Sequence, residues 1–410
     1  MGLGGRYWSL FLGDLLSNIG SHATQTALTL KIFKLTGQSS AHMGLAALTN
    51  MVSGLAGSAL GGVLAERTNR RILMMGCDLV RLLLVLALPL TERVWLLLAL
   101  AGGLLAVTAV FSPARQAMIP ALVPTQKLDL ANSLVSGSQS AVFLLGPLLG
   151  ASLFVAGGLR SVVTVDAASY LVSFAFLWGL GQVAVPPEPA LAEQRRFWHD
   201  LAEGVTQVGT RPDLALLLTL SMAAGLAVGV VIPLLRPFVT EALGSGDATY
   251  ALILGCFGLG GLVGPWLAMV AMRWVGLGRA LLAGFFLEAA LMLIWSRTTV
   301  PVLNGAVFGV WGAVVFALIP CEHTYLHARA NPAMMARTFA LMDQAMYTTQ
   351  IVGVLVVTAV GNSVHPSTLV TTAALVYLAV VAASWRSQGA RLVRGLRRLN
   401  EPVPGPGPEA

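Results

Sequence analysis

The sequence predicts an all-α polytopic membrane protein with twelve transmembrane helices, arranged as two six-helix repeats. Three observations support this prediction: the composition, a series of long apolar runs, and a repeat of features about 207 residues apart. The 410 residues are 56% hydrophobic and only 10% charged, with a mean hydropathy of +0.78. Because so few polar side chains cannot cover a water-soluble surface, most of the surrounding solvent must be lipid.

Each predicted span is long enough to cross a hydrocarbon layer of roughly 30 Å. Several contain Gly or Pro, which membrane helices tolerate better than soluble ones. The first run is too long for a cleaved signal peptide and carries polar residues such as Asp14 and Asn18. The runs lie at about 8–32, 41–65, 72–90, 94–117, 132–156, 160–182, 213–241, 248–272, 278–297, 300–320, 337–360 and 366–385.

The positive charges predict how the chain is oriented. With the N-terminus placed inside, 18 of the 25 Lys and Arg fall on the inner side, six fall outside, and Arg81 lies within a span. This excess predicts that both termini are cytoplasmic and that the protein resides in the cell membrane. The net charge of +7 is therefore a topology signal, and nucleic acid is not an expected partner.

Matching residues in the two halves of the chain predict an internal repeat. Arg67 after span 2 corresponds to Arg273 after span 8, and Pro124 after span 4 corresponds to Pro332 after span 10, at offsets of 206 and 208. The expected parts are an N-terminal six-helix bundle over 1–182, a cytoplasmic linker with an interfacial helix over 183–212, a C-terminal six-helix bundle over 213–385, and a basic cytoplasmic tail over 386–410.

The loop after span 2, GVLAERTNRR at 62–71, joins one acid to three arginines directly after a nearly uncharged segment. It resembles the signature loop between helices 2 and 3 of the major facilitator superfamily of secondary transporters. Glu66 stands where Asp is common, and Asn69, a residue able to adopt left-handed dihedrals, stands where Gly is common. The resemblance implies a gating latch that holds the two halves together in one state, whereas the alternative is that the arginines only enforce topology. The implied latch residues are Gly62, Glu66, Arg67, Arg70 and Arg71.

Two further segments carry the same resemblance. FSPARQAMIP at 111–120, with the following Val123-Pro124 and ANSL at 131–134, is similar to the branch that contains the enterobactin exporter and the macrolide efflux proteins. Its Arg115 is predicted to belong to the gating residues. We expect its side chain to contact the loop or span 11, and binding of an anionic substrate is the alternative. GPLLGA at 146–151 is similar to a motif of drug–proton antiporters, carried by Gly146, Pro147 and Gly150 but without the last Gly of the fullest version. Simple kinking and close helix packing is the alternative explanation.

Span 1 carries a polar stripe with helical spacing, which lipid would penalise. In the fold that the resemblance implies, helices 1, 4, 7 and 10 line a central cavity, so this stripe is expected to face water or substrate. Spans 7 and 10 supply bulky apolar side chains for the opposite wall, and a cavity with one polar and one apolar wall suits amphipathic molecules. The stripe comprises Asp14, Asn18, Ser21, His22, Gln25 and Thr29, and the apolar candidates are Met222, Phe308, Trp311 and Phe316.

Acidic side chains within spans are candidates for binding a proton or a substrate cation. Asp14 is the leading candidate, the alternative being a carboxylate paired permanently across the cytoplasmic gate. Asp343 begins a shorter polar stripe with Tyr347, with helix capping or pairing to Arg337 as the alternative. Glu288 lies near the middle of span 9, where a buried hydrogen bond is the alternative.

Other polar groups are interpreted as structural. Asp78 and Arg81 are i,i+3 neighbours and should neutralise each other. Asp166 is interpreted as a helix cap or packing residue, and Glu322 as part of a solvated cytoplasmic helix end. His22 is a candidate for binding a proton in the working pH range, and the favoured alternative is a neutral hydrogen-bonded ring. No catalytic, cofactor or metal site is expected.

The sequence therefore predicts a secondary active transporter that works by alternating access. By resemblance it is an exporter of small, amphipathic, drug-like molecules, driven by inward proton flow, and it acts as a monomer in the bilayer. A siderophore or lipid exporter, or an importer with the same fold, stays open from the residues alone. A non-transporting membrane sensor or scaffold is a remote alternative.

Overall fold

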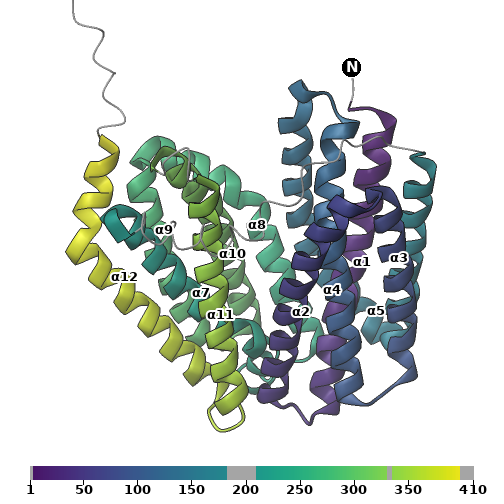
Figure 1. The fold of residues 1–410 in the computed structure, drawn as a ribbon. Helices are drawn as coiled ribbons and strands as arrows, with labels where there is room; N and C mark the ends of the chain where they lie inside the picture. The colour runs from purple at the N-terminus through teal and green to yellow at the C-terminus, as the bar shows by residue number, and fades with distance from the viewer. Residues whose placement is uncertain (1–2, 182–208, 330–334, 398–410) are drawn as a thin grey trace, which may run out of the picture.

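The computed structural model describes residues 3–181, 209–329 and 335–397, and within these ranges the chain is helical almost throughout. Figure 1 shows two helical bundles side by side, the first containing α1 to α5 and the second α7 to α12. Most of the predicted linker, at 182–208, and the end of the predicted tail, at 398–410, lie outside the described residues.

The first bundle is built from long helices joined by short turns. Its fifth helix bends at Gly157 and Gly158, where Gly158 has a φ of 67° that only Gly adopts freely, so that α5 supplies both the fifth and the sixth predicted span. The helices are α1 (Gly5–Leu35), α2 (Ser40–Arg67), α3 (Arg70–Ala87), α4 (Val94–Leu122) and α5 (Leu128–Gly179).

The second bundle has the same character. Pro212 stands at the first position of α7, where its missing N–H is not needed. The helices are α7 (Pro212–Glu241), α8 (Asp247–Val275), α9 (Leu277–Arg297), α10 (Pro301–Arg329), α11 (Met335–Val360) and α12 (Pro366–Arg397).

Within the described residues, nine helices are long and apolar enough to cross a membrane. The long α5 is one of these nine and contains two crossings because of its bend. The helices α1 and α11 have the required length but are not among the nine. They are also the helices that carry the predicted polar stripes, which lower their mean hydropathy. The prediction of an all-α polytopic membrane protein is confirmed.

Small residues bring helices into close contact within each bundle. A methyl group added to Gly57 would overlap the Ala106 carbonyl of α4, and one added to Gly264 would press against the Ala313 carbonyl of α10. Both members of the first contact lie 207 residues before their counterparts in the second, so the predicted repeat also exists at the level of helix contacts. No helix packs closely on Gly62, one of the implied latch residues, because a methyl group there would meet nothing within 4 Å.

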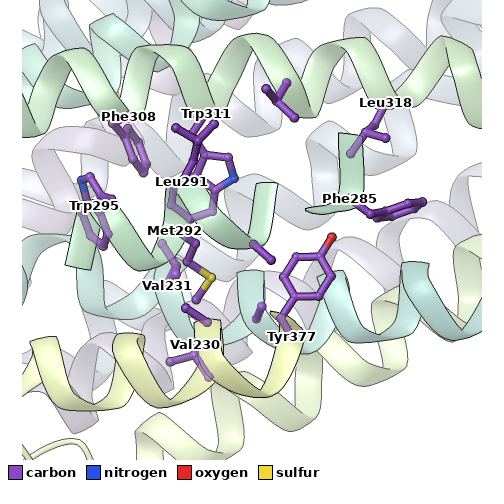
Figure 2. Packing of buried hydrophobic residues seen from close by; sticks show 14 of the residues in the cluster. Val230, Val231, Phe285, Leu291, Met292, Trp295, Phe308, Trp311, Leu318 and Tyr377 are labelled. Carbon is purple, nitrogen blue, oxygen red and sulfur yellow. The ribbon is translucent and has the colours of Figure 1, made fainter. Parts of the chain in front are cut away.

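The core of the second bundle is rich in aromatic side chains (Figure 2). Trp295 of α9 stacks on Phe238 of α7 at 4.2 Å between ring centroids and lies 5.3 Å from Phe308 of α10. Phe308 and Trp311 are only 5% and 2% exposed. The expectation that these two residues line a substrate cavity is therefore wrong, because their face of α10 packs against α9. Met222 of α7 stays partly exposed.

The two bundles meet mainly toward one end of the molecule. We call the end that carries Gly5 and Arg397 the terminal face, and the end that carries the α1–α2 and α11–α12 turns the opposite face. Near the opposite face Gly44 of α2 packs on Thr358 of α11, and further along the molecule Gly258 of α8 packs on Leu144 of α5. In Figure 1 the bundles diverge from there toward the terminal face.

We predict that Gly260→Ala destabilises the protein, because the new methyl group would overlap the carbonyl of Gly309 in α10. Overpacking of this kind costs about 1–3 kcal/mol. Gly76→Ala is the matched control, since a methyl group there meets nothing within 4 Å and alanine favours the helix. Thermal unfolding of the purified variants in detergent measures the difference, and equal melting temperatures would contradict the prediction.

Candidate functional site

The polar stripe of α1 begins at a buried ion pair. Arg115 of α4 donates from Nη1 to Asp14 Oδ2 at 2.8 Å, and Asn18 donates to the other carboxylate oxygen at 3.0 Å. The side chains of Arg115 and Asp14 are only 10% and 9% exposed. The structure thus brings together Asp14 and Asn18, predicted to bind a proton or substrate, with Arg115, predicted to act in gating. Arg115 pairs within its own bundle instead of docking on α11.

A second ion pair lies deeper in the same bundle. Arg81 donates to Asp78, as the i,i+3 spacing predicts, and Ser173 donates to the other Asp78 oxygen at 2.8 Å. The Arg81 guanidinium lies 4.4 Å from the Phe111 ring centroid and 4.9 Å from that of Tyr170. Two aromatic faces and one carboxylate therefore stabilise a cation that is 2% exposed.

Asp166 has no role as a helix cap. It lies inside the second half of α5, is 1% exposed, and accepts a hydrogen bond from Thr24 Oγ1 of α1 at 2.5 Å. Ser169 donates to it from one turn further along, at 3.3 Å. Of the two expectations for this residue, the structure excludes the cap and places the carboxyl group between two helices.

The remaining stripe residues line a cavity within the first bundle. Its volume is about 90 Å³, which leaves room for about three water molecules. Pockets that bind drug-sized ligands have volumes of about 300–1,000 Å³, so this cavity is too small for such a ligand. Its polar lining residues are Asn18, Ser21, His22, Thr24, Gln25, Thr29, Asn50, Thr108, Asp166 and Tyr170.

The antiporter-like segment packs directly on the stripe. A methyl group on Gly146 would press against the side chain of His22, and one on Gly150 would overlap the backbone of Ala23. His22 also contacts Phe143 edge to face, at 5.1 Å between ring centroids. Gly146 and Gly150 thus allow α5 to approach α1 closely, the packing role that the sequence left as an alternative, and Pro147 lies between them within α5.

The second bundle holds acids without arginine or lysine partners among the described residues. Tyr377 donates to Glu288 at 2.7 Å, and Ser221 of α7 donates to Glu322 of α10 at 3.1 Å. The interpretation of Glu322 as part of a solvated helix end is wrong, because its side chain is half-buried against α7. Asp343 lies close enough to Glu322 to interact electrostatically, and Tyr347, one turn further along α11, is 44% exposed.

Sequence reasoning missed Glu322, although a signal for it existed. Ser221 and Glu322 stand 207 residues after Asp14 and Arg115, so the two hydrogen-bonded pairs occupy equivalent places in the repeat. The first bundle carries an anion and a cation there, whereas the second carries a hydroxyl group and an anion. Applying the offset to each charged residue would have identified this position.

The predicted latch is anchored to the first bundle. Arg70 donates to the carbonyl of Ala117 at 3.1 Å, and Arg71 donates to the last carbonyls of α5, at 2.7 Å to Leu177 and 2.6 Å to Trp178. Asn69 caps α3 with a φ of −64°, so the expected left-handed conformation is wrong. Arg67 is exposed, and the side chain of Glu66 lies outside the described residues.

Charged groups close the opposite face. Asp247 of α8 accepts from Lys34 of α1 at 2.5 Å and from Arg236 of α7 at 2.6 Å. The Arg236 guanidinium also lies 4.8 Å from the ring centroid of Phe33 of α1. Nearby, Asn362 Oδ1 accepts from Ser39 Oγ and from the Ala41 amide, both at 3.0 Å. These contacts join the two bundles, and the sequence gave no reason to expect them.

Comparison with known proteins identifies the family. Residues 10–356 match the family model of the Major Facilitator Superfamily. The chain belongs to this superfamily. It is therefore a multi-pass membrane transporter of small molecules, and the resemblance of its loop motifs is confirmed.

Two relatives and one solved structure are similar to this major facilitator protein. It is 26% identical over 343 residues to multidrug resistance protein MdtG of Klebsiella pneumoniae, covering 80% of each chain. It is 25% identical over 277 residues to macrolide efflux protein A of Streptococcus pyogenes, covering 62% of this chain and 67% of that one. The fold matches a bacterial homologue of the iron transporter ferroportin in its inward-facing state, with a TM-score of 0.70, 15% identity and coverage of 96% and 99%.

We predict that Asp247→Asn loosens the opposite face, because it removes the anion shared by Lys34 of one bundle and Arg236 of the other. The partly exposed Lys34–Asp247 pair, which joins the bundles, contributes up to about 1 kcal/mol, so the ratio of open to closed molecules should rise by up to about fivefold. Distances between spin labels placed across that face measure the change. Glu241→Gln is the matched control, since this acid lies at the same face and makes no ion pair among the described residues; equal distance distributions in both variants would contradict the prediction.

Proposed function

We propose that this transporter exports small amphipathic, drug-like molecules by alternating access, driven by proton entry. One observation carries the proposal: a buried, protonatable ion pair, Asp14–Arg115, lies in a bundle that is joined to its partner mainly toward the opposite face. The names of the relatives support the choice of drug-like substrates, since one is a multidrug resistance protein and another a macrolide efflux protein.

We infer that the terminal face is cytoplasmic and that both termini lie on that side. The excess of Lys and Arg assigned to that side supports this orientation. The structure then corresponds to a transporter open toward the cytoplasm, with Lys34, Asp247 and Arg236 closing the outer side. We infer a monomer as the transporting unit, because the two bundles supply both halves of the substrate path.

The Asp14–Arg115 pair offers a means of coupling. When Asp14 is ionised, Arg115 is neutralised within the first bundle. A proton on Asp14 removes that attraction and leaves a buried guanidinium that must find another acceptor. The release of Arg115 favours a different arrangement of α1 and α4, the two helices that this ion pair joins. Glu288 and Asp343 remain candidates for a second proton-binding acid.

The latch residues act at the same face in the opposite state. Arg70 and Arg71 hold the turn between α2 and α3 against the ends of α4 and α5. Glu66 and Arg67 are the last two residues of α2, directly before that turn, and we infer that they contact the second bundle when the cytoplasmic side closes. This arrangement stabilises the outward-open state only, as a gate requires.

We predict that Asp14→Asn abolishes transport driven by a pH gradient while the protein stays folded. The amide keeps the size of the side chain but cannot exchange a proton, so coupling is lost by at least about tenfold. Efflux of dyes and macrolides from proteoliposomes with an imposed pH gradient is the measurement. Glu92→Gln, in an exposed loop, is the control; undiminished proton-driven efflux by the Asp14 variant would remove this residue from the mechanism.

We predict that Glu66→Gln slows transport by about tenfold, because the closed cytoplasmic gate loses a charge-assisted hydrogen bond. Glu66→Asp is the matched control: it keeps the carboxylate and should transport at close to the normal rate. Spin-label distances across the terminal face should show a smaller closed population in the Gln variant alone. If the two variants transport equally well, the carboxylate has no role in gating.

A further inference from the structure

One acid buried in the first bundle has no ion pair. The described residues of this bundle include three buried acids, Asp14, Asp78 and Asp166. Arg115 is paired with Asp14 and Arg81 with Asp78, and the third buried arginine, Arg70, is bound to backbone carbonyl groups. Asp166 is left without an ion-pair partner among the described residues. An unpaired carboxylate in a low-dielectric core is costly, so this position calls for one more positive charge.

Oxygen atoms surround the Asp166 carboxyl group. Thr24 Oγ1 lies 2.5 Å from Oδ2, and Ser169 Oγ lies 3.3 Å from Oδ1. The Tyr170 hydroxyl group, one turn along the same helix, is 2.9 Å from Ser21 Oγ of α1. Arg81 is the nearest charge to favour the anion, but its guanidinium is held by Asp78 and by the ring of Tyr170. Hydroxyl and carboxylate oxygens are the ligands that hard cations prefer.

The cavity along α1 gives access to this group. Asp166, Thr24 and Tyr170 all line it, and on α1 its lining runs from Asn18 to Ile32. It is large enough for about three water molecules. Water can thus hydrate an arriving ion or carry a proton to the carboxyl group. The first bundle therefore combines a buried acid that has no ion pair among the described residues with a cavity that borders this acid.

We propose that Asp166, together with Thr24 and Ser169, binds a small monovalent cation, and that this is a second binding site for the ion that drives transport. The cation is a proton on the carboxyl group or an alkali ion held by the same oxygens. This inference rests on the proposed function, because it assigns a step of cation-coupled export. It adds a site in the part of the bundle nearer the opposite face, separate from the Asp14–Arg115 pair.

The packing of α1 explains how occupancy of this site acts on the gates. Gly20 of α1 lies so close that a methyl group there would stand 2.6 Å from Asp166 Oδ1. The same helix carries Lys34 at the opposite face and Asp14 toward the terminal face. A cation at Asp166 stabilises the packing of α1 on α5. Its loss leaves an uncompensated buried anion, which favours a different arrangement of these two helices. Both gates therefore depend on the position of one helix.

Cation binding is tested first, with purified full-length protein and no substrate. Infrared difference spectra between wild type and Asp166→Asn should reveal one protonated carboxyl band at neutral pH if the cation is a proton. If it is an alkali ion, Na⁺ should raise the melting temperature of the wild type over that in choline, and Asp166→Asn should abolish this rise. The absence of both signals would overturn the proposal, whether or not transport is found.

Transport gives the second readout. Asp166→Asn should retain substrate exchange without a gradient but lose accumulation driven by a pH or Na⁺ gradient by at least about tenfold. Thr24→Val should weaken cation dependence, whereas Thr26→Val is the matched control because its hydroxyl group bonds to a carbonyl of its own helix. If Asp166→Asn does not fold, gradient-driven accumulation is measured with Thr24→Val and Ser169→Ala instead. If the variants accumulate substrate as fully as the wild type under a gradient, the proposed cation site at Asp166 is wrong. If the wild type exchanges none of the tested compounds, the proposed export function alone is wrong.

Discussion

The structure depends on one constraint: lipid cannot solvate a charge, so each buried charge needs a partner inside the protein. In the first bundle this constraint fixes how α1, α3, α4 and α5 pack, through Asp14 with Arg115 and Asp78 with Arg81. The aromatic rings of Phe111 and Tyr170 complete the environment of Arg81. Polar groups in this core therefore hold its helices together.

The two bundles share a framework but differ in their buried chemistry. Helix contacts recur at an offset of 207 residues, as at Gly57 with Ala106 and at Gly264 with Ala313. At the equivalent polar positions the first bundle carries no net charge, because Arg115 neutralises Asp14. The second bundle has Glu322 bonded to a serine hydroxyl group. The repeated helix contacts preserve the packing within each bundle, whereas the changed side chains leave the second bundle with an acid that has no cationic partner among the described residues at this position.

Different charged groups lie at the two faces. Toward the opposite face Asp247 bridges cations from both bundles, so closure depends on a few partly exposed ion pairs. At the terminal face the arginines of the α2–α3 turn are bound to carbonyl groups of their own bundle. Interactions of about 1 kcal/mol at each face are enough to shift a two-state population without locking either state.

The sequence by itself determined the fold class, the helices and the family. Hydropathy, the bias of positive charge and the motif around Arg70 are local properties, readable one segment at a time. Tertiary structure alone decided which faces of those helices meet. An apolar face toward another helix looks the same in sequence as one toward a cavity, which is why Phe308 and Trp311 proved to be core residues. Likewise, whether an acid is paired depends on helices far along the chain. Asp14 is paired with Arg115, 101 residues away, whereas the partners of the Asp166 carboxyl group among the described residues are hydroxyl groups.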